Sequence, residues 1–344
     1  MWSVPDVKHV SGTYPFVFGS STWARTRDLR INSPALYRLS YRGISRYYSK
    51  MQSLLSTSVR IPKVLTIAGS DSSGGAGLQA DLKVITALGG YGMSVITAIT
   101  AQNTLGVTRI QDIDLDVVEA QIDAVLLDIG ADIVKIGMLA SPEIVKTVAK
   151  VLRKHRVKRI VLDPVLRATS GASLGGDDTA QAMISELFPI ASLITPNLDE
   201  TSLLLGREIS GPNDFKLAAE ELLEMGSQAV LIKGGHLDST HTQITDYLMW
   251  RTLEDELEVV LTKEFKHYRV KTANTHGTGC SLASAIATYL ADGHDLSHAV
   301  AKAIAYVEAG LEAGCFLSIG EGPGPLWHMH DFYPTALQDE KEKN

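Results

Sequence analysis

The sequence predicts an α/β protein whose mostly parallel sheet is covered by helices on both faces. Three observations support this prediction. From Pro62 onward, short apolar runs alternate with amphipathic segments of about ten or more residues, which is typical of βαβ units. Glycines and polar side chains follow the apolar runs, as they do where parallel strands end at a ligand site. No internal repeat and no Pro- or Ser-rich linker divides residues 62–330, which favours one domain.

Strands are predicted where the apolar runs are short and rich in β-branched residues. They are expected at 63–69, 93–103, 131–139, 159–166, 192–197 and 228–236, and residues 245–272 resemble meandering antiparallel strands. Helices are predicted where apolar residues recur every three or four positions. These segments are 77–89, 114–130, 142–155, 177–191, 214–226, 279–293 and 296–314.

The charge of the chain is unevenly distributed. The 344 residues carry a formal net charge of −7, yet residues 1–60 hold nine Lys and Arg against two Asp. The remainder is therefore strongly acidic, which argues against nucleic acid as the main partner. No apolar run approaches the roughly 18–20 residues of a membrane span. Two cysteines are too few for a disulfide scaffold. We expect no nucleic-acid or membrane partner and a cytoplasmic location.

The first 60 residues are rich in Arg and Ser and poor in acids, which is the composition of an organellar transit peptide. The stretch Arg46-Tyr47-Tyr48-Ser49 is similar to a mitochondrial processing site. An organellar location is therefore the alternative if residues 1–50 act as such a peptide. A disordered extension and a true start at Met51 are the other interpretations. We expect an extension at 1–60, the functional domain at 61–332 and a charged tail at 333–344.

Polar residues follow six predicted strands, and ligands of such folds bind beyond the carboxyl ends of the strands. These groups are Gly69-Ser70-Asp71, Gln102-Asn103, Gly137-Met138, Asp163-Pro164, Asn197 and Lys233-Gly234-Gly235-His236. Because parallel strands end at one edge of a sheet, the sequence predicts a single site there.

Glycine-rich stretches suggest where a phosphate could bind. A Walker-type P-loop is absent, and "GSDSSGGAG" lacks the spacing of a dinucleotide-binding loop, so a structural turn is its default interpretation. The stretch "THGTGC" at 275–280 is a stronger signal. Gly277 and Gly279 flank Thr278 at a helix start, where backbone N–H groups and the helix dipole attract anions. The alternative is an ordinary helix cap formed by Thr275 or Thr278.

Cys280 lies in the first turn of the same predicted helix. Most buried cysteines are inert, but a helix N-terminus lowers a thiol pKa and makes the thiolate accessible near neutral pH. Phosphoryl transfer depends mainly on positioning and charge neutralisation, so a weak base can suffice. Cys280 could accept or orient the proton of an attacking hydroxyl. Cys315 has no such setting and is expected in the core.

Charged groups suited to Mg²⁺ and phosphate follow three strands. Asp163 ends "RIVLDP", and Asn197 and Glu200 form an N-x-x-E pattern. Carboxylates beside phosphates are typical Mg²⁺ ligands, although Glu200 could simply be a solvated first-turn residue. Lys233 precedes a Gly-Gly pair that ends at Gly235, and it could reach nucleotide phosphates as a point charge.

Gln102 is the candidate specificity residue. A carboxamide presents a donor and an acceptor side by side, which matches the amino group and ring nitrogen of an aminopyrimidine. A buried, backbone-satisfied Gln is the competing interpretation.

Taken together, several stretches closely resemble the hydroxymethylpyrimidine/phosphomethylpyrimidine kinases of thiamine biosynthesis, which are ribokinase-like enzymes. These stretches are "VLTIAGSDSSGGAGLQADLK", "ITAQNT", "KIGMLAS", "VLDPV", "LITPNLDE", "LIKGGH", "NTHGTGC" and "GEGPGPLWHMH". The resemblance covers about 62–332 and implies a three-layer α/β/α sandwich. It also implies two ATP-dependent steps, from hydroxymethylpyrimidine to its monophosphate and then to the diphosphate. Most ribokinase-like enzymes carry a catalytic Asp where this chain has Cys280, whereas the pyrimidine kinases have G-T-G-C.

The resemblance also implies roles for individual residues. The pyrimidine would contact Gly69, Asp81, Gln102, Met138 and Val165. ATP and Mg²⁺ would lie near Asp163, Asn197, Glu200 and Lys233, with Gly277 and Gly279 forming an anion hole around Cys280. Neither the thiaminase-like domain of fungal relatives nor the plant fusion to thiamine-phosphate synthase is expected, and a homodimer is expected because dimers are common in the superfamily.

Two other functions remain open at this point. Some vitamin B6 kinases share the fold and the Gly-Thr-Gly-Cys loop, so a pyridoxal kinase is the alternative, and only a pyrimidine kinase should form a diphosphate. A non-catalytic pyrimidine sensor would be expected to lose Lys233, Glu200 or the glycine loop, all of which are present.

Overall fold

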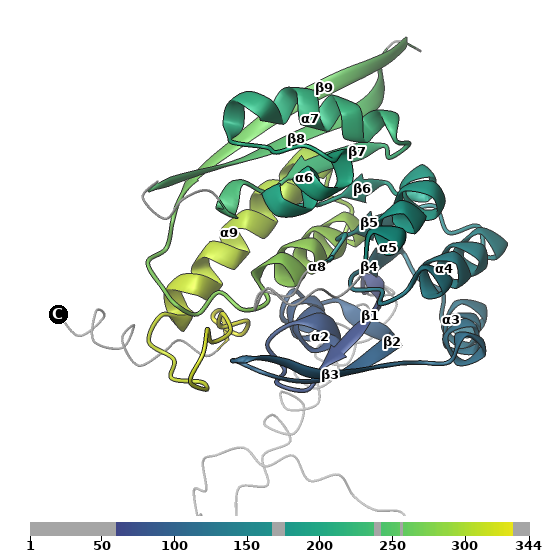
Figure 1. Cartoon of the computed structure of the whole chain (residues 1–344), viewed down its shortest axis with the longest axis horizontal. Coiled ribbons are helices and arrows are strands. Elements are labelled where there is room, and N and C mark those ends of the chain that lie inside the picture. The colour runs from purple at the N-terminus through teal and green to yellow at the C-terminus, as the bar shows by residue number, and fades with distance from the viewer. Residues whose placement is uncertain (1–59, 167–175, 237–241, 255–256, 333–344) are drawn as a thin grey trace, which may run out of the picture. The chain divides into compact units, whose positions relative to one another are not determined.

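The computed structural model describes residues 60–166, 176–236, 242–254 and 257–332. These residues form one nine-stranded sheet with helices on both faces (Figure 1). The strands are β1 (Lys63–Asp71), β2 (Tyr91–Asn103), β3 (Gly106–Asp112), β4 (Ile133–Ile136), β5 (Ile160–Leu162), β6 (Leu193–Ile194), β7 (Ala229–Ile232), β8 (Gln243–Glu254) and β9 (Leu257–Tyr268). The helices are α2 (Gly77–Ala87), α3 (Leu115–Asp128), α4 (Pro142–Lys154), α5 (Asp177–Ala182), α6 (Leu198–Leu205), α7 (Pro212–Glu224), α8 (Thr278–Ala291) and α9 (Leu296–Gly314).

The sheet has the order β3-β2-β1-β4-β5-β6-β7-β8-β9. Strands β2, β1, β4, β5, β6 and β7 run parallel, and β3, β8 and β9 pair antiparallel with their neighbours. The central parallel strands are short and apolar because both of their faces are covered. The predicted mostly parallel α/β sandwich is confirmed.

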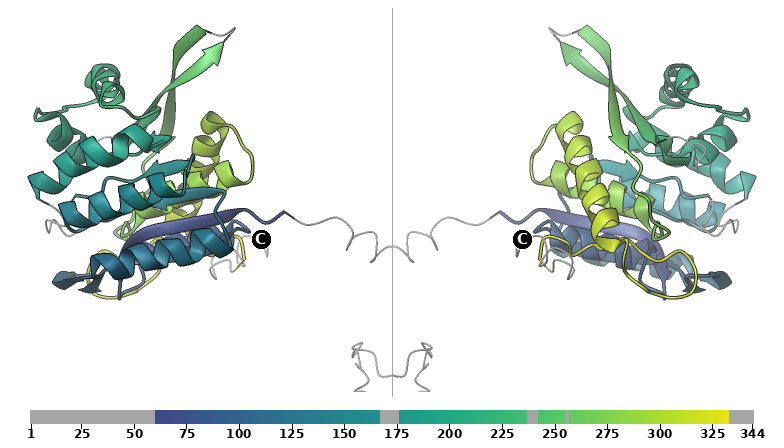
Figure 2. Two further views of the ribbon diagram at one scale, coloured as in Figure 1. Left: turned by 90° about the vertical axis from the view of Figure 1, so that its right-hand side faces the viewer. Right: turned by 90° about the vertical axis from the view of Figure 1, so that its left-hand side faces the viewer.

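The ribbon views in Figure 2 show helices on both faces of the sheet. Two clusters of buried apolar side chains join the sheet to these helices. One cluster joins the sheet to α3, α4, α5 and α7. The other joins it to α2, α8 and α9. Since α8 lies under the central strands, its N-terminus meets the edge of the sheet where the parallel strands end.

Two elements were not expected from the sequence, and one is divided differently. The strand β3 is an exposed edge strand, and α6 has only eight residues. The predicted helix at 177–191 is divided into α5, a π-helical turn (Met183–Leu187) and a 3-10 turn (Phe188–Ile190). The antiparallel prediction for 245–272 is confirmed by β8 and β9, which project as a long hairpin (Figures 1 and 2).

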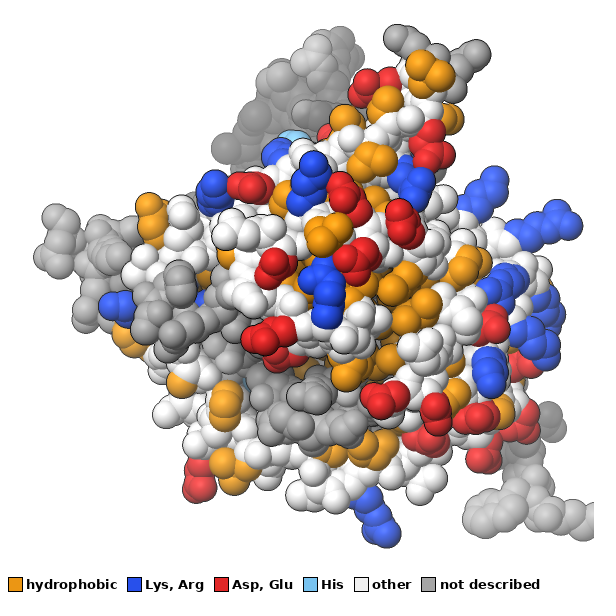
Figure 3. All heavy atoms as spheres, turned by 45° about the horizontal axis from the view of Figure 1, so that its top comes forward, with side chains coloured by type: hydrophobic (Ala, Val, Ile, Leu, Met, Phe, Trp, Pro, Cys, Tyr) orange, Lys and Arg blue, Asp and Glu red, His pale blue; other side chains and the backbone are white. Residues whose placement is uncertain are grey.

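Charged side chains of both signs are mixed on the face shown in Figure 3. Basic side chains gather on the side of α4, where Lys154 lies 2.8 Å from Asp123 of α3 and Arg153 lies 2.7 Å from Glu186. Exposed pairs of this kind contribute little to stability. In the part of the chain that the structure describes, no helix combines the length and apolar character needed to cross a membrane. The predicted extension and tail lie outside the described residues, apart from Arg60.

Candidate active site

Three neighbouring parallel strands bring their following residues together at one edge of the sheet. Asp163 follows β5, Thr195 follows β6 and Lys233 follows β7. The Lys233 ammonium lies 2.8 Å from Asp163 Oδ1, and the Thr195 hydroxyl donates to the same oxygen at 3.1 Å. Burial alone would lower the pKa of Lys233, but Asp163 and Glu200 outweigh it, so its pKa is raised. Lys233 is therefore a permanent cation at the strand ends.

Asn197 and Glu200 form a capping box at the start of α6. The Asn197 side chain accepts from the Glu200 N–H, and the Glu200 carboxylate accepts from the Asn197 N–H, both at 2.8 Å. Glu200 is therefore a first-turn residue, as the structural interpretation held, but it is buried rather than solvated. Its Oε2 lies 3.9 Å from Lys233 Nζ. Burial raises its pKa to about 7, although Lys233 acts in the opposite direction.

The glycine loop before α8 approaches this charged group closely. Gly277 has a φ of +82°, and a Cβ there would collide with the Gly75 carbonyl oxygen, so only glycine fits. A Cβ on Gly279 would lie 3.4 Å from Lys233 Nζ and 3.7 Å from an Asp163 oxygen. No side chain caps α8, because the Thr278 hydroxyl donates to the Thr275 carbonyl instead. The Thr278 N–H donates to the Thr275 carbonyl at 3.4 Å, but no side chain caps the N–H groups of Gly279 and Cys280, as an anion site requires.

Cys280 lies in this first turn and is partly exposed. Burial raises the pKa of its thiol to about 11, and the attraction of Lys135 is too weak to reverse that effect against Asp81 and Asp163. The expected lowering of the pKa by the helix terminus is therefore wrong. At neutral pH Cys280 is a protonated thiol, which can orient a hydroxyl but carries no negative charge.

The residues expected to hold a pyrimidine lie on two sides of the strand ends. Gly69 of β1 faces Met138, because a Cβ on Gly69 would lie 3.0 Å from the Met138 sulfur. Val165 stands just beyond Asp163 and is partly buried. Gln102 belongs to β2, where the pairing with β3 shifts register between Ala101 and Gln102. Irregularities of this kind re-aim side chains near functional sites.

Asp81 is a buried carboxylate with several partners inside the protein. Its side chain is 0% exposed and accepts from Thr66, Lys135 and Ser284 at 2.6–2.9 Å. Both of its oxygens are therefore engaged within the protein, and a contact of Asp81 with the pyrimidine stays a prediction. Lys135, which sequence reasoning missed, is also fully buried, and Asp81 keeps it charged although burial acts against the charge. A lysine inside the apolar run "ADIVKIGML" was the available signal.

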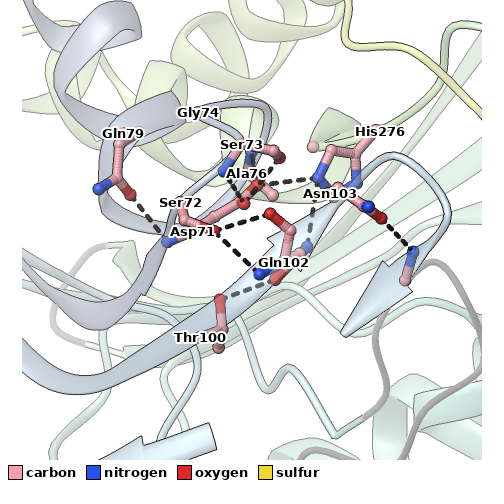
Figure 4. A network of polar contacts seen from close by, with 12 residues as sticks. Asp71, Ser72, Ser73, Gly74, Ala76, Gln79, Thr100, Gln102, Asn103 and His276 are labelled. Atoms are coloured by element: carbon pink, nitrogen blue, oxygen red, sulfur yellow. Dashed lines mark hydrogen bonds and ion pairs between the residues drawn. The ribbon is translucent and has the colours of Figure 1, made fainter. Parts of the chain in front are cut away.

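The loop that follows β1 fixes Gln102 (Figure 4). The Ser72 hydroxyl donates to the Gln102 carbonyl at 2.7 Å and accepts from the Gln102 N–H at 2.9 Å. Asp71 lies 2.9 Å from His276 Nε2, which in turn lies 3.3 Å from the Gln102 amide. The stretch "GSDSSGGAG" is therefore more than a turn, and His276 is a second residue that sequence reasoning missed.

A depression of about 580 Å³ lies on β9 and α9. It is lined by Lys266, His267, Tyr268, Arg269, Val270, Lys271, Glu308 and Glu312. The Arg269 guanidinium donates to the Gly235 carbonyl at 3.0 Å, so the depression adjoins the glycine pair after Lys233.

Known proteins of related sequence and structure identify the family of this chain. The family model "Phosphomethylpyrimidine kinase" matches residues 71–327. The hydroxymethylpyrimidine/phosphomethylpyrimidine kinase of Rhizobium meliloti is 47% identical over 270 residues, which are 78% of this chain and 97% of that protein. The probable thiamine biosynthetic bifunctional enzyme, chloroplastic, of Oryza sativa is 42% identical over 289 residues, and the match spans only 51% of that longer protein.

Two solved structures have the same fold at substantial identity. The crystal structure of phosphomethylpyrimidine kinase from Clostridium difficile has a TM-score of 0.60 and 42% identity, over 72% of this chain and 98% of that one. Pyridoxal kinase from Staphylococcus aureus in complex with ADP has a TM-score of 0.70 and 34% identity, over 79% of this chain and 95% of that one. The predicted ribokinase-like kinase resemblance is confirmed, and the chain belongs to the phosphomethylpyrimidine kinase family.

Proposed function

We propose that this chain uses ATP to phosphorylate hydroxymethylpyrimidine and then phosphorylates the monophosphate to the diphosphate, in thiamine biosynthesis. The observation that carries the proposal is the approach of Lys233 and Asp163 to the uncapped start of α8 at Gly279. A buried cation, a carboxylate and free backbone N–H groups at one point suit a transferring phosphoryl group.

The γ-phosphoryl group would lie between Lys233 and the loop from Gly277 to Gly279. Lys233 would neutralise its oxygens, and the backbone N–H groups would hold the charge that develops during transfer. Asn197 and Gly235 flank Lys233 on the nucleotide side, and the depression beside Gly235 has room for the rest of the nucleotide.

Mg²⁺ would accompany the nucleotide. Within the described residues, no three metal-ligating side chains gather into a cage. Asp163 and Glu200 nevertheless offer two carboxylates beside Lys233, and Mg²⁺ in kinases is usually held by one or two carboxylates together with phosphates and water. When bound there, Mg²⁺ would neutralise charge on the phosphate oxygens.

Cys280 would touch the acceptor hydroxyl in the first step. A neutral thiol can accept a hydrogen bond from the alcohol and align its oxygen without removing its proton beforehand. The proton can pass to a phosphate oxygen or to water once the bond to phosphorus forms, because phosphoryl transfer passes through a loose transition state. In the second step the attacking phosphate oxygen is already ionised and needs no base.

The pyrimidine ring would lie between Gly69, Met138 and Val165, with Gln102 reading its polar edge. The absence of a side chain at Gly69 leaves space against the Met138 sulfur, which can pack on an aromatic ring. The Gln102 amide would pair with the amino group and the adjacent ring nitrogen.

Pyridoxal kinase activity is the second candidate, because a pyridoxal kinase has a TM-score of 0.70 to this chain at 34% identity. Pyridoxal is also a hydroxymethyl heteroaromatic alcohol, so the same thiol and anion site could act on it. Only the pyrimidine function requires a second phosphorylation.

The test is product analysis with the full chain. Hydroxymethylpyrimidine, ATP and Mg²⁺ should yield the monophosphate first and the diphosphate later, resolved by chromatography. Lys233→Met should abolish both products, whereas Lys216→Ala, at an exposed lysine of α7, should leave them unchanged. Formation of pyridoxal phosphate without any pyrimidine diphosphate would refute the proposal.

Location and assembly stay predictions. We propose a cytoplasmic enzyme, or an organellar one if residues 1–50 act as a transit peptide, as a relative named chloroplastic makes reasonable. Fusing residues 1–60 to a fluorescent protein distinguishes these two locations. We also propose a homodimer, which light scattering of the purified chain would detect as twice the mass of 37.2 kDa.

A further inference from the structure

Asp71, His276 and Gln102 form a linked network beside the site (Figure 4). His276 is 6% exposed and Asp71 is 3% exposed. The His276 Nε2 atom lies 2.9 Å from Asp71 Oδ2 and 3.3 Å from the side-chain nitrogen of Gln102. One ring nitrogen thus faces two side chains, and the position of its proton determines what each of them can do.

The carboxylate of Asp71 determines which ring nitrogen of His276 carries the proton. Its Oδ1 accepts from the N–H and the hydroxyl of Ser73, and its Oδ2 accepts from the Ala76 N–H, at 2.7–2.8 Å. Hydrogen bonds from His276, Ser73 and Ala76 lower the pKa of Asp71 even though burial acts in the opposite direction. Asp71 is therefore an acceptor only, and Nε2 of His276 must carry a proton that points toward it.

A protonated Nε2 has a consequence for the Gln102 amide. An N–H group of Gln102 cannot donate to a nitrogen that is itself a donor, so the amide oxygen must face His276. The other end of the amide lies 3.0 Å from the Thr100 hydroxyl, whose single proton is also within reach of the Ser70 carbonyl, at 3.0 Å. With the amide nitrogen on that side, Gln102 donates to Thr100, Thr100 donates to Ser70, and the amide oxygen shares the Nε2 proton of His276 with Asp71.

We propose that His276, held by Asp71, is a positioning residue that fixes the carboxamide of Gln102 with its oxygen toward His276 and its nitrogen toward Thr100. The remaining N–H and lone pair of the amide then face the ring of the substrate in one order only. An aminopyrimidine that offers an acceptor and a donor in the complementary order is bound, and a ring without the amino group is not. This inference rests on the proposed function and adds the residue that sets its specificity.

The surroundings of His276 keep the ring in place. Its backbone N–H donates to the Gly324 carbonyl at 3.0 Å, and a Cβ on Gly75 would collide with ring atom Cδ2. Gly75 therefore leaves the space that the imidazole occupies. The Gln102 backbone is held separately by Ser72, so loss of His276 should free the amide without moving the strand.

A double-mutant cycle tests the coupling between positions 276 and 102. His276→Leu should lower kcat/KM for hydroxymethylpyrimidine about tenfold, mainly through KM, because an oriented hydrogen-bonding pair is lost. KM for ATP should stay within about twofold. In the Gln102→Ala background, the same change at 276 should cost less than about threefold. An equal loss in both backgrounds would overturn the proposal, because a merely structural role does not depend on Gln102.

Two further variants keep the result interpretable if His276→Leu folds poorly. His276→Gln places an N–H near the position of Nε2 and should recover most of the activity. Gly75→Ala should displace the ring and reproduce the loss, whereas Gly176→Ala, where a Cβ meets nothing within 4 Å, should be neutral. If Gly75→Ala leaves kcat/KM for the pyrimidine unchanged, the positioning role is refuted.

Substrate discrimination provides the last measurement. The wild type should prefer hydroxymethylpyrimidine to the analogue without the amino group, and His276→Leu should lose most of that preference. Absence of any turnover of hydroxymethylpyrimidine by the wild type would refute the proposed function. Turnover with unchanged discrimination in His276→Leu would refute only the present inference.

Discussion

Glu200 is a buried carboxyl group whose ionisation should make the folded protein less stable. It is 5% exposed, and its pKa rises from 4.5 to about 7, chiefly because burial removes it from water. Replacement by Gln removes the charge but keeps an oxygen that can accept from the Asn197 N–H, so the capping box survives. Lys233 keeps its 2.8 Å contact with Asp163 in this variant.

The direction in which stability changes with pH follows from the protons bound by the folded and unfolded states. Between pH 4.5 and 7 the folded state holds the proton of Glu200 while the unfolded state releases it, so stability falls as the pH rises through this window. The difference between 4.5 and about 7 corresponds to roughly 3 kcal/mol. Glu200→Gln should therefore be more stable than the wild type by about 3 kcal/mol above pH 7.5, and equally stable near pH 4.

Thermal melting measured from pH 4 to 8 checks this expectation. An advantage of 3 kcal/mol corresponds to roughly 6 °C in the melting temperature of a domain of this size. Glu220→Gln, at an exposed glutamate of α7, serves as the control and should change stability by less than about 0.5 kcal/mol at any pH. A Glu200→Gln variant that is less stable than the wild type at pH 8 would show that the carboxylate stabilises the fold, and the reasoning would fail.

Three other predictions concern the charges and the thiol near α8. Cys280→Ala should slow the first phosphorylation more than the second, because the phosphate oxygen that attacks in the second step is already ionised. Equal losses in separate single-turnover assays would contradict this. With Cys315→Ser as background, alkylation of Cys280 by iodoacetamide should rise about tenfold per pH unit from 8 to 10, since its pKa is about 11; a plateau near pH 8 would mean a low thiol pKa. Lys135→Met should lower the free energy of unfolding by about 3–5 kcal/mol, because Asp81 stays buried without its cation. A loss under 1 kcal/mol in urea titrations would refute that account.

The spacing of apolar residues along the sequence predicted most helices and strands, but it missed the edge strand β3 and the short helix α6. Each helix buries one apolar stripe and each parallel strand buries both of its faces, so their sequence patterns are strong. The strand β3 is largely exposed and carries "GVTRIQD", which has too little apolar alternation to stand out. The helix α6 has eight residues, and its N-terminal signal "NLDE" also matched a metal-binding pattern. The same four residues therefore form a helix cap and include two of the predicted site residues.

The site was predicted where topology alone determines proximity. Asp163 follows β5 and Lys233 follows β7, and both strands run parallel to β6 between them. Because parallel strands end at one edge of a sheet, a shared site for these two residues could be foreseen. The pKa of Cys280 could not be predicted in this way, because it depends on the burial of the thiol and on the nearby Asp81 and Asp163. These groups raise the pKa, whereas a helix N-terminus would lower it. His276 was also missed, because its partner Asp71 lies 205 positions away in the chain.

The charges around α8 constrain how a nucleotide can be held. The two lysines described near the start of α8 are already paired, since Lys135 pairs with Asp81 and Lys233 pairs with Asp163. The side chains by themselves therefore offer little net positive charge to a triphosphate, and Glu200 adds negative charge above pH 7. The attraction must come from the backbone N–H groups at Gly279 and Cys280 and from a cation that arrives with the phosphates. A thiol at position 280 fits this arrangement better than a carboxylate, because a neutral group orients the acceptor hydroxyl without repelling the phosphoryl group that it must attack.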